Sequence, residues 1–250
     1  MGDALEFYIK DLFCNSLHVN DLEKKNEIYS KYFSYIGNQN NPPDIMIRNG
    51  DAIEVKKIES LKSGIALNSS YPKDKLHYDS PMITNACKVC ENWREKDLIY
   101  TIGVANDGKL KALWFIYGDC YAAEKEVYER IRNKISTGII ELPDVEFSQT
   151  NELGRVNRVD PLGITYLRIR GMWGIDNPIK VFDYATSISN DSEFSVNAIM
   201  LSEKYVSFPK KDREKVEGLI GKNFSIKDIK IKSPNNPANL LDAKLLSFTK

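Results

Sequence analysis

The sequence predicts a mixed α+β fold in which a central mixed sheet is flanked by helices. Predicted helices and strands follow one another without the regular strand–helix–strand repeat of a parallel α/β protein. Hydrophobic residues make up 42% of the 250 residues, which is ordinary for a globular chain. A chain of this length can bury a full core, and we expect a single domain over residues 1–250.

Hydrophobic periodicity and turn residues place the elements along the chain. Residues 3–17 carry apolar side chains at helical spacing, and residues 21–37 are predicted to form a second helix that ends near Gly37. Residues 44–48 and 52–58 are predicted strands. Further helices are expected at 81–96, 121–138 and 209–221, and further strands at 97–106, 110–118, 164–173, 194–201 and 224–232.

The charge and cysteine content restricts the class of protein. The net charge is zero, with 35 basic and 35 acidic residues, which argues against a large non-specific footprint on nucleic acid but permits a local basic cleft.

No apolar run is long enough to span a bilayer and MGDALEFYIK is no secretory signal, so we expect a cytoplasmic protein without membrane contact. Cys87 and Cys90 form a CxxC without a second pair, which favours reduced structural thiols over zinc.

The stretch NPPDIMIRNGDAIEVKKIES, residues 41–60, matches the PD-(D/E)xK signature of metal-dependent nucleases through Asp44, Glu54 and Lys56. Oxygen ligands from Asp44, Glu54 and the backbone carbonyl of Val55 suit Mg²⁺, and Lys56 would orient the attacking water. Glu6, on the first helix, is a candidate for an additional metal carboxylate, the alternative being a solvated helix face. The alternative for the whole stretch is a solvated amphipathic hairpin with a charged exposed face.

The nuclease hypothesis makes a structural demand on the turn of this hairpin. Side chains alternate between the two faces of a strand, so Glu54 and Lys56 share a face. A two-residue turn at Asn49-Gly50 would direct Asp44 to the opposite face. A three-residue loop over 49–51 would pair residue 44 with residue 56 and bring all three groups together. The hypothesis therefore requires a loop of odd length or a bulge.

Longer strings in the first half of the chain carry a family resemblance. They are Gly2-Asp3-Ala4-Leu5-Glu6, the Pro43-Asp44 and Glu54-Val55-Lys56 pair, Leu67-Asn68-Ser69-Ser70-Tyr71-Pro72-Lys73, residues 79–83, residues 90–93 and residues 96–100. With them the chain resembles the NgoPII-type restriction endonucleases, most strongly over residues 2–104. Relatives are expected to carry an additional N-terminal segment before the helix that starts here at Gly2.

The resemblance implies a PD-(D/E)xK fold and a Mg²⁺-dependent type II restriction endonuclease. Such an enzyme acts as a homodimer on double-stranded DNA at a short palindrome, for this family usually GGCC. A cognate DNA methyltransferase is implied as a genetic partner only. We expect the catalytic core over about residues 1–140, and DNA-recognition and dimerisation elements over about 141–250.

Two groups of residues are candidates for DNA contacts. Small polar and basic side chains that follow the catalytic strand suit phosphate contacts, which fix register without reading sequence; they are Asn68, Ser69, Ser70, Lys73 and Lys75. A later cluster offers the donors and acceptors that a GGCC reader needs; it comprises Arg155, Asn157, Arg158, Arg168 and Arg170. The alternatives are a flexible polar loop for the first group and surface ion pairs for the second.

Two other functions remain open on these residues. The same catalytic centre would serve a repair nuclease or a junction resolvase, which would nick DNA or cut junctions without a short recognition site. A non-catalytic DNA-binding module would carry the hairpin incidentally. A balanced charge together with a discrete arginine cluster favours the reader of a short site over the repair nuclease or resolvase.

Overall fold

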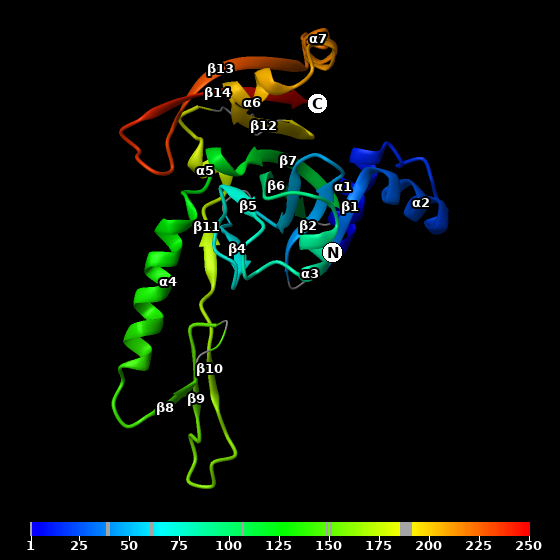
Figure 1. Ribbon diagram of the computed structural model, residues 1–250. Helices are drawn as coiled ribbons and strands as arrows, with labels where there is room; N and C mark the ends of the chain where they lie inside the picture. The colour runs from blue at the N-terminus through cyan, green and yellow to red at the C-terminus, as the bar shows by residue number, and fades with distance from the viewer. Residues whose placement is uncertain are drawn as a thin grey trace.

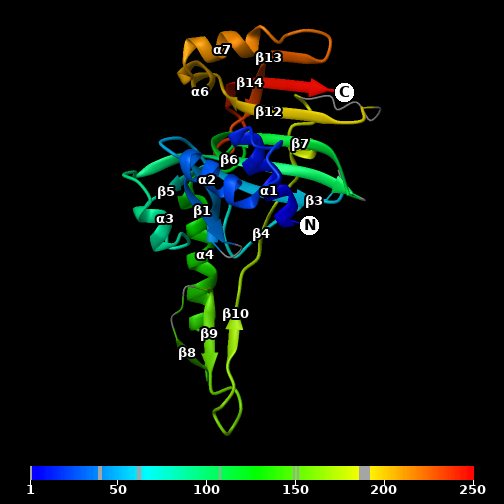
Figure 2. The ribbon, with the colours of Figure 1, turned by 90° about the vertical axis from the view of Figure 1, so that its right-hand side faces the viewer.

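A computed structural model describes residues 2–38, 41–60, 63–106, 108–148, 150, 152–185 and 192–250. A large sheet forms the body of the molecule, and its C-terminal strands lie at the top of Figure 1 beneath two short helices. A long projection extends from the body at the opposite end, and it points the same way in the two perpendicular views of Figures 1 and 2. We call this projection, residues 125–172, the arm.

The large sheet is mixed, as predicted. Within the described residues it has nine strands, eight of them in the order β1-β2-β3-β6-β7-β12-β14-β13, with β5 paired to β6. The pairs β3–β6 and β7–β12 are parallel and the other neighbours are antiparallel. The strands are β1 Phe33–Asn38, β2 Asn41–Ile47, β3 Ala52–Ile58, β5 Lys75–His77, β6 Glu95–Asn106, β7 Lys109–Tyr117, β12 Ser195–Leu201, β13 Phe224–Lys232 and β14 Leu240–Thr249.

Two small sheets lie outside the large one. The first belongs to the arm and contains β8 Glu146–Ser148, β9 Gly154–Asn157 and β10 Leu167–Ile169 in the order β10-β9-β8. The second pairs β4 Ile65–Asn68 with β11 Trp173–Ile175 and so joins the chain after β3 to the base of the arm. Asp107, in the middle of the expected turn after β6, lies outside the described residues.

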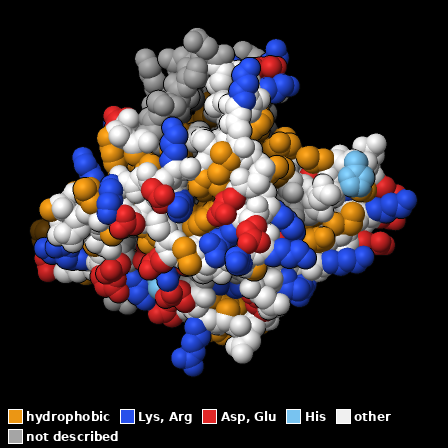
Figure 3. All heavy atoms as spheres, turned by 90° about the horizontal axis from the view of Figure 1, so that it is seen from above, with side chains coloured by type: hydrophobic (Ala, Val, Ile, Leu, Met, Phe, Trp, Pro, Cys, Tyr) orange, Lys and Arg blue, Asp and Glu red, His pale blue; other side chains and the backbone are white. Residues whose placement is uncertain are grey.

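The helices flank the sheet, and α4 forms the part of the arm nearer the body (Figure 1). They are α1 Gly2–Cys14, α2 Leu22–Tyr32, α3 Asn85–Val89, α4 Lys125–Ile140, α5 Pro178–Val181, α6 Ser202–Ser207 and α7 Lys210–Glu217, with a 3₁₀ turn η1 at Gly118–Cys120. None of the helices in the described ranges is both long enough and apolar enough to cross a membrane. Figure 3 shows basic and acidic side chains interspersed over the upper face, in keeping with the zero net charge.

Two of the predicted helices are wrong in extent. The helix expected over 21–37 ends at Tyr32, and the following residues form β1, whose Phe33 and Tyr35 are buried. The helix expected over 81–96 is reduced to α3, which Thr84 caps, and β6 already begins at Glu95. In both places pairing with a neighbouring strand, β2 or β5, outweighs the local preference for helix.

The C-terminal half differs from prediction in its strands. The single strand expected over 164–173 is split into β10 and the start of β11, which belong to different sheets. Strand β14 was not predicted, although it lies between β12 and β13 and pairs with both along its length. Because β12 also pairs with β7, the large sheet continues across the boundary near residue 140.

Close packing fixes α1 against the middle of the sheet. A side chain at Gly103 of β6 would come within 2.6 Å of Leu5 Cδ2, so the glycine leaves room for Leu5 of α1 against the sheet. Leu5 and Ile9 are buried against the sheet by this contact. The helix that carries Glu6 is therefore held beside β3 and β6.

A partly buried charge network ties the first hairpin to the C-terminal layer. Lys204 of α6 donates to Asp51 Oδ1 at 2.9 Å and to Asp97 Oδ2 at 2.6 Å, and the Tyr117 hydroxyl donates to Asp51 Oδ2 at 2.7 Å. One ammonium thus balances two carboxylates that come from different strand ends. Removing it would leave Asp51 poorly compensated and Asp97 with only the more distant Lys75, whose ammonium lies 3.7 Å away.

We predict that Lys204→Met lowers the free energy of unfolding by about 3 kcal/mol, because Asp51 and Asp97 lose their shared cation. Urea titration followed by circular dichroism measures this quantity. The control is Lys210→Met, which removes an exposed pair with Glu214 at 3.6 Å and should change stability by less than about 0.5 kcal/mol. Equal effects of the two substitutions would contradict the role given to Lys204.

Candidate active site

The turn between β2 and β3 has the odd length that the nuclease hypothesis requires. Ile45 pairs with Ile53 and Met46 with Ala52, and Ile47 N donates to Asp51 O at 3.0 Å. The loop is therefore Arg48-Asn49-Gly50, with Asn49 in the left-handed region at φ 56°. The demand for an odd loop is confirmed.

The register of the hairpin differs from the one expected. A loop over 49–51 would have placed Asp44 opposite Lys56, and this pairing is wrong. The observed pairs, continued by one residue beyond Ile45 and Ile53, place Asp44 opposite Glu54. Because the shift is two residues, every side chain keeps its face, and Asp44 still lies on the face of Glu54 and Lys56.

Two buried side chains hold the loop in this form. Glu91 Oε2 accepts from Asn49 N at 3.0 Å, and Lys96 Nζ donates to Gly50 O at 2.5 Å. Glu91 and Lys96 also form an ion pair with each other. We call this pair the turn clamp. The sequence hypothesis gave no role to Glu91 or Lys96, although both lie in the strings that carry the family resemblance.

Asp44, Glu54 and Lys56 meet in one mostly buried cluster. Lys56 Nζ lies 2.6 Å from Glu54 Oε1 and 3.9 Å from Asp44 Oδ2. Asp44 Oδ2 also accepts from Val55 N at 2.6 Å. The structure thus brings together the three side chains that the sequence singled out, and it excludes the solvated hairpin face as a description of this surface.

Burial governs the electrostatics of this cluster. It raises the pKa of the Asp44 carboxyl to about 7, and the charge of Glu54 acts in the same direction against the opposing effect of Lys56. Burial by itself would lower the pKa of the Lys56 ammonium, but the carboxylates of Glu54 and Asp44 raise it above its usual value. Two adjacent carboxylates with one ammonium leave the cluster short of positive charge.

The donor set fits a hard divalent cation. Glu54 Oε2 is buried and has no hydrogen-bond partner among the described residues, so it is available as a ligand. Carboxylate oxygens from Asp44 and Glu54 are the ligands that Mg²⁺ prefers. The described residues contain no group of three or more His, Cys, Asp or Glu side chains that could hold a metal ion. Substrate, water and the Val55 carbonyl would have to complete a site here.

Glu6 lies outside this immediate donor set. Its Oε1 accepts from Lys10 Nζ at 3.1 Å, one helical turn further along α1. Its charge nevertheless raises the pKa values of Asp44 and Lys56 slightly, so the helix end lies within electrostatic range of the cluster. The structure does not bring Glu6 into a three-carboxylate group with Asp44 and Glu54.

The segment that follows β4 differs from the open polar loop that was expected. Asn68 and Ser69 are exposed, but Lys73 is only 6% exposed and its ammonium donates to Ser70 Oγ and to Tyr71 O. Burial lowers the pKa of Lys73 to about 8, and no carboxylate of the described residues pairs with it within 4 Å. Lys75 pairs with Glu95 at 2.8 Å.

Tyr100 brings Lys73 close to the acidic cluster. Tyr100 of β6 lies beside Glu54 in the parallel pair β3–β6, so their side chains share a face, and its hydroxyl accepts from Lys73 N at 2.7 Å. The charges of Glu54 and Lys56 both act on the Lys73 ammonium. Burial of this lysine beside the centre was not visible in the sequence, where it stood in a polar string.

The second group of DNA-contact candidates, four arginines and Asn157, lies on the arm. Three of the arginines form ion pairs there. Arg168 and Arg170 both pair with Glu152, and Arg158 lies 3.6 Å from Glu146. Arg155 stacks on the Tyr166 ring with its guanidinium 4.0 Å from the centroid. Asn157 Nδ2 donates to Ser148 Oγ at 3.0 Å. The arginines are gathered on one small sheet, and Arg168, Arg170 and Arg158 have acidic partners there.

Together, the mixed sheet and its flanking helices are compatible with a restriction endonuclease-like fold, and comparisons with known proteins give the class directly. A model of the NgoPII restriction endonuclease family matches residues 1–232. The chain is 51% identical over 248 residues to a Neisseria gonorrhoeae protein described as type II restriction enzyme NgoPII, covering 99% of this chain and 88% of that protein. No solved structure matches the present chain.

The chain is therefore a restriction endonuclease, an enzyme that cleaves DNA at specific sites. It belongs to the NgoPII restriction endonuclease family. The resemblance seen in the strings of the first half of the sequence is confirmed, and the match extends well beyond residue 104.

We predict that Asp44→Asn stabilises the metal-free protein at pH 8 and has little effect at pH 4. The pKa of Asp44 lies at about 7 in the folded chain and near 3.8 in the unfolded chain, so the folded state binds the proton more tightly. The free energy of unfolding of the wild type should therefore fall as pH rises from 4 through 7, by up to about 4 kcal/mol.

Urea titrations in EDTA across this pH range test the prediction. Asp212→Asn, at an exposed position on α7, is the control and should follow the wild-type curve. The prediction would be wrong if the free energy of unfolding changed with pH in the same way in the wild type and in Asp44→Asn. Burial would then not raise the pKa of Asp44 in the folded chain.

Proposed function

We propose that this chain is a Mg²⁺-dependent type II restriction endonuclease that cleaves double-stranded DNA at a short palindrome, GGCC. The observation that carries the catalytic part is the facing of Asp44 and Glu54 across a three-residue turn, with Lys56 Nζ 2.6 Å from Glu54. The site GGCC is inferred from family resemblance. A palindrome calls for a homodimer, because each copy then meets an identical half-site.

In this proposal Asp44, Glu54 and the Val55 carbonyl hold the cation. When bound, Mg²⁺ supplies positive charge that polarises the scissile phosphate and acidifies the attacking water. The Val55 N–H holds the Asp44 carboxylate in place at 2.6 Å. Lys56 donates to the water and stabilises negative charge on the phosphate, and the turn clamp keeps β2 and β3 in the register that this needs.

We assign the DNA contacts to two surfaces. Asn68, Ser69, Ser70 and Lys75 would meet phosphates beside the centre, while Lys73 would reach a phosphate only from within the protein. The arm would carry the base-reading residues, namely Arg155, Asn157, Arg158, Arg168 and Arg170. Residues 1–140 would thus hold the catalytic core and residues 141–250 the recognition and dimer elements. A methyltransferase that protects host DNA would be its genetic partner.

We predict that Asp44→Ala, Glu54→Ala and Lys56→Ala each reduce plasmid cleavage at least about 1,000-fold while leaving DNA binding in Ca²⁺ intact. Each variant removes a cation ligand or the ammonium but leaves the phosphate-binding surface unchanged. Single-turnover cleavage and gel-shift titration measure the two properties. Lys57→Ala, which changes the next lysine on the opposite face of β3, should cleave within about threefold of the wild type. Undiminished cleavage by Asp44→Ala and Lys56→Ala would refute the assignment of the centre.

A digest of plasmid DNA of known sequence tests the reaction and its site. The expected result is discrete bands whose ends map to GGCC, with no cleavage in EDTA and restoration by Mg²⁺. Random nicking, or selective cutting of branched DNA, would instead support a repair nuclease or a resolvase. Binding without cleavage in any divalent cation would support a non-catalytic module.

A further inference from the structure

The arm carries the most exposed apolar side chains of the described chain. Leu162 is 77% exposed and Ile164 72%, and both lie in the loop at the far end of the arm, whereas Met172, 75% exposed, lies at its base next to Trp173 of β11. Val159, Tyr166 and Leu167 are more than half exposed beside that loop. We call the five residues Val159, Leu162, Ile164, Tyr166 and Leu167 the apolar tip. Isolated exposed apolar residues are common, but a contiguous group of this kind marks an interaction surface.

The apolar tip is built on an ordered loop. Asp160 Oδ2 accepts from Thr165 N at 2.7 Å and from the Thr165 hydroxyl, while Val159 N donates to Thr165 O at 3.2 Å. Gly163, at φ 74°, closes the turn by donating to Asp160 O at 2.9 Å. These contacts leave Leu162 and Ile164 pointing away from the chain that supports them. The loop is therefore arranged to present apolar side chains.

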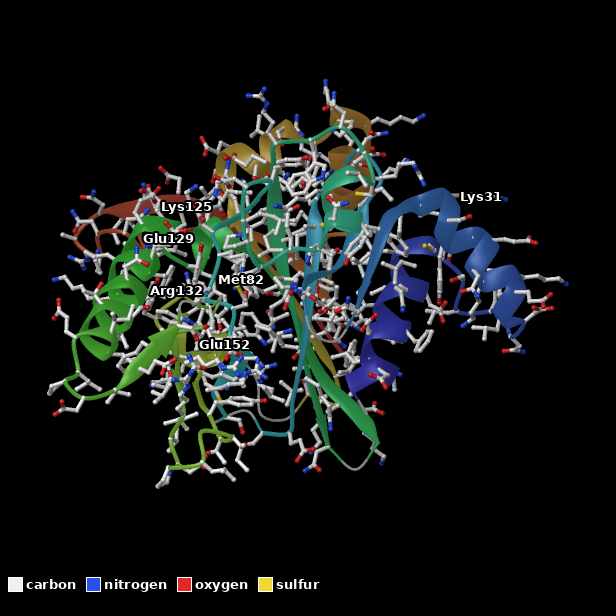
Figure 4. The ribbon with its side chains drawn as sticks, turned by 60° about the horizontal axis from the view of Figure 1, so that its bottom comes forward. Lys31, Met82, Lys125, Glu129, Arg132 and Glu152 are labelled. Carbon is white, nitrogen blue, oxygen red and sulfur yellow. The ribbon has the colours of Figure 1, made fainter. Side chains whose placement is uncertain are left out.

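The base of the arm is fixed to the body, so the tip is held at a distance from it. Tyr71, Tyr128 and Trp173 form an aromatic cluster with ring centroids 5.6 to 6.2 Å apart. Trp173 is thus a packing residue at the base of the arm. Figure 4 shows Lys125, Glu129 and Arg132 on the side of α4 toward Met82 and the body, and Glu129 accepts from the Tyr71 hydroxyl at 3.0 Å. The distant tip has no core of its own chain to pack against in either view.

Charge decides between the two macromolecules that could cover the tip. DNA binding needs cations that are free to replace counterions at phosphates. The five tip side chains are uncharged. Arg158, which borders the tip, pairs with Glu146, and Arg168 and Arg170 pair with Glu152. Basic and acidic residues are nearly equal in number over 125–172. An apolar, charge-balanced surface fits a protein partner better than a polyanion.

We propose that the apolar tip is a contact surface between two copies of this chain. The inference deepens the proposed function, in which a homodimer acts on one palindrome, by naming where the copies meet. The five side chains leave on the order of 600 Å² of accessible surface per copy, a large part of the roughly 800 Å² that each partner buries in a standard stable interface. In an isologous contact each tip would be covered by the partner's equivalent surface.

The place of the arm in the fold suits this role. It leaves the body next to β4, the strand that follows the catalytic strand β3, and the β4–β11 pair links the two. Two arms joined at their tips would therefore link the two bodies that carry the proposed catalytic residues. Association through the arms would also leave the acidic clusters of both copies open to substrate.

The test is the molar mass of the full-length chain in solution. Sedimentation equilibrium should show the wild type as a dimer at micromolar concentration. The double variant Leu162→Asp/Ile164→Asp should associate roughly 100-fold more weakly, because it places four carboxylates in a symmetric apolar contact. Its far-UV circular dichroism and thermal midpoint should match the wild type, since neither side chain packs in the core. Leu219→Asp, at a 67% exposed position after α7, is the matched control and should remain dimeric.

Each other outcome overturns the proposal. A monomeric wild type, or a double variant that stays dimeric, would show that the tip does not join two copies. A dimeric double variant with lost affinity for duplex DNA in Ca²⁺ would assign the tip to DNA. The variant Asp44→Asn separates this inference from the proposed function. It should lose DNA cleavage but keep the molar mass of a dimer. Cleavage by Asp44→Asn would refute the catalytic assignment, while the molar mass alone would decide on the tip.

Discussion

The three-residue turn at Arg48-Asn49-Gly50 is the constraint on which the catalytic geometry depends. Its odd length places Asp44 on the same face as Glu54, whereas a two-residue turn would direct these carboxylates to opposite faces of the sheet. The turn clamp of Glu91 and Lys96 contacts Asn49 N and Gly50 O, so a salt bridge from outside the hairpin selects the loop. A local choice between two turn lengths thereby decides whether Asp44, Glu54 and Lys56, the proposed catalytic residues, meet on one face.

Bringing those carboxylates together costs stability. Burial and mutual repulsion raise the pKa of Asp44, Glu54 Oε2 has no partner among the described residues, and Lys73 is buried nearby without a carboxylate of its own. Such arrangements persist when the surrounding structure holds them, here through the parallel pair β3–β6 and the packing of α1 at Gly103. The destabilised part of the molecule coincides with the part that meets the substrate in the proposed function.

The arm carries two distinct surfaces, one basic and one apolar, that the sequence did not distinguish. Its small sheet gathers the arginines, in ion pairs with Glu152 and Glu146, while the loop at its far end exposes several apolar side chains. An arginine held by a glutamate must exchange that partner before it can bind a base or a phosphate, which favours recognition of a specific site over non-specific attraction. The zero net charge of the whole chain has the same consequence. The arm thus combines a guarded basic surface with a surface suited to a second copy.

The sequence by itself determined the mixed fold class, most of the longer strands, the cluster of Asp44, Glu54 and Lys56, and the family. These follow from period-two patterns, from turn residues and from strings whose identity does not depend on distant contacts. Only the tertiary structure decided the register of the first hairpin, the change from helix to strand at Phe33, the insertion of β14 between β12 and β13, and the burial of Lys73. Each of these depends on a partner far away in sequence, such as Glu91 for the turn or β12 for β14. Local patterns report the preference of a segment, whereas the neighbour with which it pairs is settled only when the whole sheet assembles.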